Sequence, residues 1–208
     1  YVGRAETDQV WGMAINQLGN GLSEANHHED ALSVQGAELS MRQRLGALPE
    51  QILVMQTNLA NTYERLGRRE EAARMQRDVY SGCMRIRGEE DRQTFLVAEN
   101  FALTLLRADL FEEAKSVLLK TVPVARRVLG ESDAVTLKIR WCLAIGLYSD
   151  PGATLDDVRE AVSTLEDIEP SARRVLGGSH PLLSGMTLSL QESRAVLRAR
   201  ETPSASAP

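Results

Sequence analysis

The sequence predicts an all-α fold, a solenoid of about four helical hairpins followed by a C-terminal capping helix. Three observations predict it. Glycines recur at intervals of 42 residues, at Gly46, Gly88 and Gly130, and a fourth follows at Gly177. Apolar residues inside each interval have helical spacing, and no stretch alternates strictly enough for a strand. With 208 residues, 43% of them apolar, the chain is long enough to bury a sizeable core.

Small residues recur in step with these glycines. Each repeat has an apolar or small pair, and an alanine follows thirteen residues after the first member of the pair. Only the last interval is longer, at eighteen, and the surplus falls in the turn-forming residues 149–153. We expect the second residue of each pair and each later alanine to face the partner helix. The pairs are Leu18-Gly19, Leu59-Ala60, Phe101-Ala102 and Leu143-Ala144, and the alanines are Ala31, Ala72, Ala114 and Ala161.

The expected elements follow in order. Each period fits two helices of about 15 to 20 residues and a short turn. We expect repeats at about 8–46, 50–88, 92–130 and 134–177, within a single domain of residues 1–200. Thr154 and Asp157 have the spacing of a capping box that opens the last second helix. Pro181 suits the first position of a capping helix over about 181–200, and residues 201–208 have the composition of a disordered tail.

Two prolines depart from the repeat pattern. Pro123 and Pro170 each lie nine residues after the repeat alanine, inside a second helix. Proline removes one helical hydrogen bond and crowds the carbonyl four residues earlier. We therefore expect a bend or break near residues 120 and 167.

Several segments resemble the tetratricopeptide repeats (TPRs) of the kinesin light chain type, whose period is 42 residues. They are residues 57–63 (TNLANTY), 67–72 (GRREEA) and 176–181 (LGGSHP). The resemblance covers residues 8–190 and implies a right-handed α-solenoid whose first helices line a concave groove. It also implies a non-enzymatic scaffold that binds a peptide or protein segment in that groove. The alternative is a stable architectural subunit of a larger complex, docking through its edges or convex face.

The tetratricopeptide register selects the groove residues. One end is rich in amides, which can bind a peptide backbone, and the other is apolar and aromatic. Trp141 and Tyr148 have a second interpretation, in which the capping helix covers them. The candidate binding residues are Asn16, Asn20, Thr57, Asn61, Arg65, Glu99, Leu103, Arg107, Lys138, Trp141 and Tyr148.

Comparison with related tetratricopeptide domains restricts the class of ligand that the resemblance implies. Tetratricopeptide domains that bind a chaperone's terminal carboxylate use basic residues beside their asparagines, whereas Leu96 and Asn100 occupy those positions here. The paired asparagines of kinesin light chains appear as Thr57-Asn58, Glu99-Asn100 and Trp141-Cys142. The resemblance therefore implies a protein or peptide partner, but neither of these two known ligand classes.

Composition bears on the remaining function classes. The chain has 24 basic and 29 acidic side chains, for a net charge of −5, which argues against nucleic acid as the main ligand. Its longest apolar run is far short of the roughly 20 residues of a membrane span.

The three histidines, His27, His28 and His180, form no catalytic or metal-binding pattern, and we expect no catalytic residues, metal or cofactor. Cys83 and Cys142 are expected to be buried thiols, with a disulfide as the alternative.

The first residue of the chain bears on the cellular compartment of the protein. Residue 1 is Tyr rather than Met, which is typical of a processed or partial chain. A cytoplasmic location is the expectation, and import into an organelle with loss of a targeting segment is the alternative.

Overall fold

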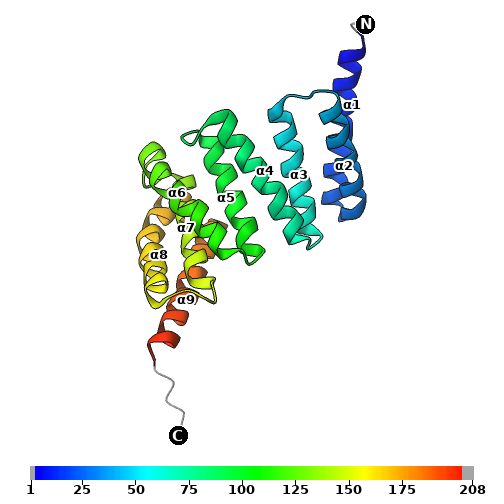
Figure 1. The fold of residues 1–208 in the computed structure, drawn as a ribbon. Helices are drawn as coiled ribbons and strands as arrows, with labels where there is room; N and C mark the ends of the chain where they lie inside the picture. The colour runs from blue at the N-terminus through cyan, green and yellow to red at the C-terminus, as the bar shows by residue number, and fades with distance from the viewer. Residues whose placement is uncertain (1–2, 203–208) are drawn as a thin grey trace. The chain divides into compact units, whose positions relative to one another are not determined.

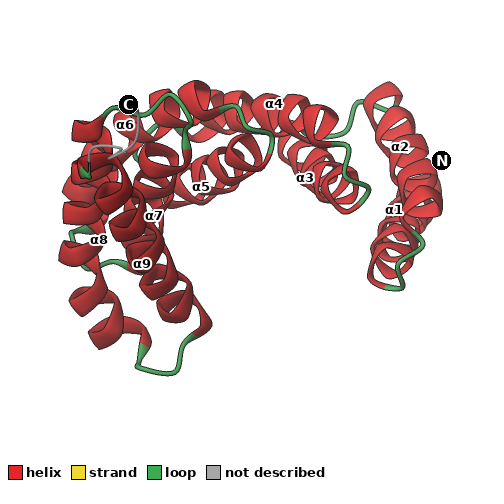
Figure 2. Ribbon diagram, turned by 90° about the horizontal axis from the view of Figure 1, so that it is seen from below, coloured by secondary structure: helices red, strands yellow, loops and turns green. Residues whose placement is uncertain are grey.

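The computed structural model describes residues 3–202, and within that range the chain forms nine α-helices and no strand. Figure 2 shows the helices in red, joined by green loops. The all-α prediction is confirmed. The helices are α1 (Gly3–Glu24), α2 (His28–Arg44), α3 (Pro49–Arg65), α4 (Arg69–Arg87), α5 (Arg92–Arg107), α6 (Phe111–Leu129), α7 (Ala134–Ser149), α8 (Leu155–Leu176) and α9 (Pro181–Glu201).

The chain folds into two compact units. Unit 1 ends at Ile86 and contains α1 to α4, and unit 2 begins at Arg87 and contains α5 to α9. The single domain that we expect over residues 1–200 stays a prediction.

Within each unit, helices that are near one another in the chain pack together. In unit 1, α1 packs against α2, α2 against α3, and α1 also against α3. In unit 2, each helix from α5 to α9 packs against the next, and α7 also packs against α5 and α9 (Figure 1). Within each unit, successive first helices are therefore neighbours, α1 and α3 in unit 1 and α5, α7 and α9 in unit 2, as a solenoid of helical hairpins requires.

The recurring glycines end the second helix of each repeat. Gly46, Gly88, Gly130 and Gly177 all have φ between 72° and 91°. At Gly130 and Gly177, ψ is also near 150–160°, a conformation that is essentially restricted to glycine. The 42-residue spacing is therefore a spacing of backbone turns that only glycine makes without strain.

Helices α5, α7, α8 and α9 begin with side-chain caps. Asp91 and Asp133, 42 residues apart, each accept a hydrogen bond of 2.8 Å from the backbone N–H two residues on. His180 Nδ1 accepts one of 3.1 Å from Leu182 N–H at the start of α9. Thr154 and Asp157 form the predicted capping box, which is confirmed.

The repeat alanines lie in the packed interior of the helices. Ala31, Ala72, Ala114 and Ala161 are fully buried, as are Ala60, Ala102 and Ala144 of the recurring pairs. Gly19 is buried against Gln35, where a Cβ would lie 2.8 Å from the Gln35 Cγ atom. The predicted role of these small residues in helix packing is confirmed.

The prolines do not end their helices. α6 continues through Pro123 and α8 through Pro170, so neither helix breaks. Both prolines are exposed, as are Leu119 and Glu166, whose carbonyls they leave without a helical donor. Water can hydrogen-bond to these carbonyls, which explains why the helices tolerate proline. The expected bends stay a prediction.

The helix after the last repeat is the predicted cap. α9 packs on both α8 and α7, the position that a further first helix would take. Leu183 and Met186 anchor it and are almost completely buried. The expected disordered tail lies outside the described residues from residue 203 onward.

Candidate protein-binding surface

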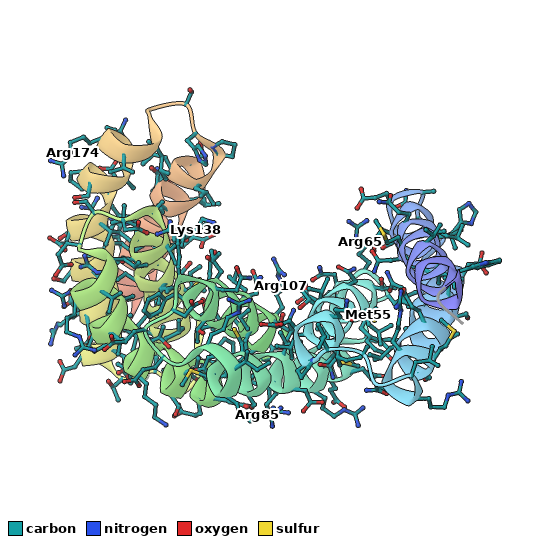
Figure 3. All side chains as sticks on the ribbon, turned by 90° about the horizontal axis from the view of Figure 1, so that it is seen from above. Met55, Arg65, Arg85, Arg107, Lys138 and Arg174 are labelled. Carbon is teal, nitrogen blue, oxygen red and sulfur yellow. The ribbon has the colours of Figure 1, made fainter. Side chains whose placement is uncertain are left out.

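In unit 1 the candidate residues lie on α1 and α3. Asn20, Asn61 and Arg65 are exposed, whereas Asn16 and Thr57 are half-buried. Figure 3 shows Arg65 of α3 and Arg85 of α4 on opposite sides of this unit. The first helices therefore present a polar surface of their own, distinct from that of α4.

Arg65 ties the two first helices together. Its guanidinium donates to the Ser23 carbonyl at 3.0 Å and forms an ion pair with Glu24 at 2.7 Å. The Thr57 hydroxyl donates to the Leu53 carbonyl of its own helix at 2.8 Å. Both candidate side chains thus have structural partners within unit 1.

A chain of side-chain hydrogen bonds links the buried Thr62 of α3 through Gln35 of α2 to the asparagines of α1. The Thr62 hydroxyl donates to Gln35 Oε1 at 2.8 Å, Gln35 Nε2 to Asn20 Oδ1 at 3.3 Å, and Asn20 Nδ2 to Asn16 Oδ1 at 3.1 Å. The Asn16 side chain in turn hydrogen-bonds to the Glu38 carboxylate. Each residue thus donates to the next one in the direction of Glu38. Hydrogen bonds arranged in such a series strengthen one another.

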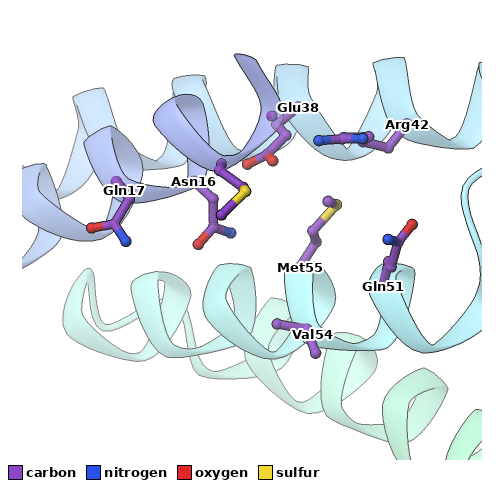
Figure 4. Close-up of a pocket in the computed structure, with 9 residues that line it drawn as sticks. Asn16, Gln17, Glu38, Arg42, Gln51, Val54 and Met55 are labelled. Carbon is purple, nitrogen blue, oxygen red and sulfur yellow. The ribbon is translucent and has the colours of Figure 1, made fainter. Parts of the chain in front are cut away.

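Glu38 borders a pocket of about 280 Å³ between α1, α2 and α3. Figure 4 shows Glu38 and Arg42 of α2 on the side of the pocket that faces Gln51, Val54 and Met55 of α3. Apolar and polar groups therefore meet in one cavity. The lining residues are Gly12, Met13, Asn16, Gln17, Glu38, Arg42, Gln51, Val54 and Met55.

The polar groups of the pocket are incompletely paired. Glu38 is only 2% exposed, and its Oε1 atom has no hydrogen-bond partner. Burial raises the pKa of the Glu38 carboxyl, an effect that Arg42 and Asn16 partly offset. The Nε atom of Arg42 is also buried without a partner. Arg42 lies against Gly12, where a Cβ would come within 1.2 Å of the guanidinium.

Sequence reasoning placed Asn16 on this surface but missed Glu38 and Arg42. The missed pair lies on a second helix, which we did not expect to line the groove. A signal was present, because Ala31, Gln35, Glu38 and Arg42 follow one another at three to four residues and so share one face of α2. Since Ala31 is a packing position, the polar residues on its face are directed inward.

In unit 2 the candidate residues lie on α5 and α7. Glu99 is buried and faces Lys138, with Nζ and Oε1 3.5 Å apart. Burial raises the pKa of the Glu99 carboxyl, and Lys138 partly offsets the effect. Leu103 is half-buried and Arg107 is exposed. Figure 3 labels Arg107 and Lys138.

Trp141 and Tyr148 of α7 are both directed at the capping helix. Trp141 Nε1 donates to Ser189 Oγ at 2.9 Å, and the Tyr148 hydroxyl donates to Glu192 Oε2 at 2.8 Å. Burial, with a contribution from Glu192, raises the pKa of Tyr148 to about 12. The structure thus has the arrangement in which α9 covers these aromatics, and a role for them in partner binding stays a prediction.

Cys83 and Cys142 are free and buried, so the described structure has no disulfide between them. Burial raises the pKa of the Cys142 thiol, which keeps it protonated. Among the side chains that the structure describes, those of residues 10–202, no three His, Cys, Asp or Glu residues form a cluster that could hold a metal ion. In that same range, no helix combines the length and apolarity needed to cross a membrane.

Comparisons with known proteins agree with this architecture. Residues 52–92 match the tetratricopeptide repeat family model. A structure of a Podosopora anserina kinesin light chain protein with nearly identical TPR-like repeats is 17% identical, with a TM-score of 0.72 over 91% of this chain and 88% of that chain. BtubC (BKLC) from P. vanneervenii is 19% identical, with a TM-score of 0.68 over 98% of this chain and 89% of that chain. A search of curated protein sequences finds no match.

Proposed function

We propose that this chain, a tetratricopeptide repeat protein whose fold is of the kinesin light chain type, is a non-enzymatic scaffold that binds a peptide or protein segment. The segment binds along the surface of the first helices. Proteins with this fold act generally through protein partners, and the candidate surface indicates where this chain does so.

One observation carries the proposal. The adjacent helices α1 and α3 expose the amides of Asn20 and Asn61 beside a pocket with apolar walls. Amides both donate and accept hydrogen bonds, so they can pair with the backbone of an extended or helical segment. The pocket offers a place for an anchoring side chain, and such anchors dominate binding energy at interfaces.

The experiment compares affinity capture by the wild type and by a Val54→Glu, Asn61→Ala double variant. Both residues are exposed on α3, so the fold should tolerate the change. The control is a Leu119→Glu, Ser116→Ala double variant on the exposed face of α6. We expect a partner that the control retains and the α3 variant loses, with equal thermal stability by circular dichroism. Retention of every partner by the α3 variant would refute the proposal.

A second candidate function, a fixed subunit of a larger complex, is favoured by a different observation. α1 exposes several large apolar side chains, and Trp11 is 67% exposed. Contiguous exposed apolar groups are typical of interfaces. A stable complex should co-purify through high salt and dissociate when Trp11→Ser and Val10→Ser are introduced, whereas a transient adaptor should elute alone. The exposed residues are Val10, Trp11, Met13 and Leu18.

A further inference from the structure

Helix α1 has a row of exposed residues on the side turned away from α2. Gly19, on the opposite side of the helix, lies against Gln35 of α2. The exposed residues follow one another at intervals of three, four and three, so they share one face. Residues 10–23 contain no Asp, Glu, Lys or Arg, so this face has no charged neighbour in that stretch. We call the row the outer stripe, and it consists of Trp11, Ala14, Leu18 and Gly21.

The repeat aligns the outer stripe with covered positions of α3 and α7. Leu18 is 55% exposed, whereas its counterparts Leu59 and Leu143 are only 4% and 6% exposed. The outer stripe therefore occupies the position of a packing interface but is open to solvent. The alignment pairs Gly19 with Ala60 and Ala144, and the corresponding stripes are Ile52, Met55, Leu59 and Thr62 in α3 and Thr136, Ile139, Leu143 and Gly146 in α7.

In both counterparts the stripe contacts the second helix of the preceding repeat. The Thr62 hydroxyl donates to Gln35 of α2 at 2.8 Å, and the Thr136 hydroxyl donates to the Ala125 carbonyl of α6 at 3.3 Å. A Cβ on Gly146 would lie 3.5 Å from Lys115 Cγ of α6. The outer stripe of α1 is therefore a helix-packing face that no helix within residues 3–202 covers.

The other end of the helical array has a different surface. The exposed face of α9 is mostly polar, which is typical of a terminal helix that caps a solenoid. The outer stripe of α1 has no polar side chain. α9 thus has the surface of a cap and α1 has the surface of an interface. The exposed face of α9 consists of Ser184, Leu188, Gln191, Ala195 and Arg198.

The outer stripe is complementary in size to its own reverse. In two antiparallel α1 helices related by a two-fold axis level with residue 16, Trp11 of one copy faces Gly21 of the other. Ala14 faces Leu18 in the same register. Every large side chain thus meets a small one, which is the arrangement that lets facing helices interdigitate, and the symmetry repeats each contact.

The counterparts that pack within the chain lack this property. Reversing the α3 stripe pairs Met55 with Leu59, and reversing the α7 stripe pairs Ile139 with Leu143, so large residues meet large ones. The size pattern of α1 therefore favours a second copy of α1 over the second helix of another repeat.

We propose that the outer stripe of α1 binds the outer stripe of a second copy of this chain, in an antiparallel dimer with two-fold symmetry. The absence of charge over residues 10–23 leaves no like-charge pair between these stretches of the two copies. The inference rests on the second candidate function, since it names the subunit that covers α1. A single pair of helices is at the small end of specific interfaces, so the dimer is reversible.

Sedimentation velocity of the full chain over a range of micromolar concentrations tests the dimer. The wild type should show a concentration-dependent dimer, and Leu18→Glu should weaken association roughly tenfold or more, because it buries a carboxylate between the helices. Leu188→Glu is the matched control, since both leucines are 55% exposed, and it should dimerise like the wild type. Circular dichroism confirms that both variants are folded. A monomeric wild type, a dimer that survives Leu18→Glu, or a dimer that Leu188→Glu also abolishes would overturn the proposal.

Disulfide cross-linking tests the antiparallel register. When Ala14→Cys and Leu18→Cys proteins are mixed and oxidised, mass spectrometry should find mainly links between position 14 of one chain and position 18 of the other. The native Cys83 and Cys142 are buried and should not take part. A parallel pair would instead link Leu18→Cys chains to each other, and a majority of such links would refute the proposed register.

The outcomes separate this inference from the function on which it rests. If the purified chain is a monomer but a larger complex dissociates when Trp11→Ser and Val10→Ser are introduced, the second-copy assignment is wrong and the subunit function stands. If the chain dimerises through Leu18 but no larger complex co-purifies through high salt, the dimer stands and the subunit function is wrong.

Discussion

Replacing Gly185 by alanine tests whether the capping helix is integral to unit 2. Gly185 lies on α9 directly against the Trp141 indole, where a new Cβ would lie 2.8 Å from Cη2 and 2.9 Å from Cζ2. Contacts this short force the indole or the helix to move. The indole also donates the hydrogen bond to Ser189 that joins α7 to α9. The substitution should therefore weaken the attachment of the cap.

The expected magnitude is the balance of three effects. Alanine is favoured over glycine inside a helix by about 1 kcal/mol. Overpacking costs about 1–3 kcal/mol, and loss of the Trp141–Ser189 hydrogen bond costs about 1 kcal/mol. The free energy of unfolding should thus fall by about 1–3 kcal/mol. Gly36→Ala on α2 is the matched control, because a Cβ there meets no atom within 4 Å. The control should gain up to about 1 kcal/mol.

Urea unfolding followed by circular dichroism measures both variants. Trp141 fluorescence reports on unit 2 alone in a Trp11→Phe background, because the chain has only two tryptophans and Trp11 is exposed. A Trp141→Leu background removes the ring that Gly185→Ala would strike, so the same substitution should there be neutral or stabilising. If Gly185→Ala stabilises the wild type as much as Gly36→Ala does, the packing of α9 on Trp141 is wrong.

Three further predictions concern stability. Ala72→Leu should lower the free energy of unfolding by about 1–3 kcal/mol because Ala72 is fully buried. The control substitution Ala37→Leu, at an exposed position, should have little effect. Equal urea midpoints for the two variants would contradict the repeat register. Thr154→Ala should cost about 1 kcal/mol through the lost capping box, against no loss for Ser163→Ala on the exposed face of α8, as measured by thermal unfolding. Burial raises the pKa of Glu99, so the native state binds its proton more tightly than the unfolded state. The stability of the wild type should therefore fall as pH rises from the usual glutamate pKa through the raised one, a component that Glu99→Gln lacks. Urea midpoints of both proteins at several pH values measure this difference, and parallel curves would refute it.

The periodic features of the fold were predictable because they depend on backbone geometry. The glycine positions require a positive φ, and the alanine positions allow no larger side chain, so both leave a trace in single residues. Gly82 shows the same constraint outside the pattern, since a Cβ there would lie 2.5 Å from Leu53 Cδ2. The division of the chain after Ile86 leaves no such trace, because the 42-residue spacing continues through it.

The pocket was only partly predictable. Asn16 could be found because the repeat register identifies the inward positions of first helices. Glu38 and Arg42 also have the spacing of an ordinary surface ion pair on a helix, four residues apart, and their burial depends on how α1 and α3 lie against α2. The choice between two roles for Trp141 required the position of α9, which the period does not specify.

The series of hydrogen bonds that begins at Thr62 has a fixed direction. A hydroxyl has one proton, and each carboxamide in the series accepts through its oxygen and donates through its nitrogen. Turning over any one amide would bring two oxygens, or two NH₂ groups, face to face. The orientations of Gln35, Asn20 and Asn16 are therefore set together rather than one by one, and the atom that Asn16 offers to a carboxylate on α2 depends on the two amides before it.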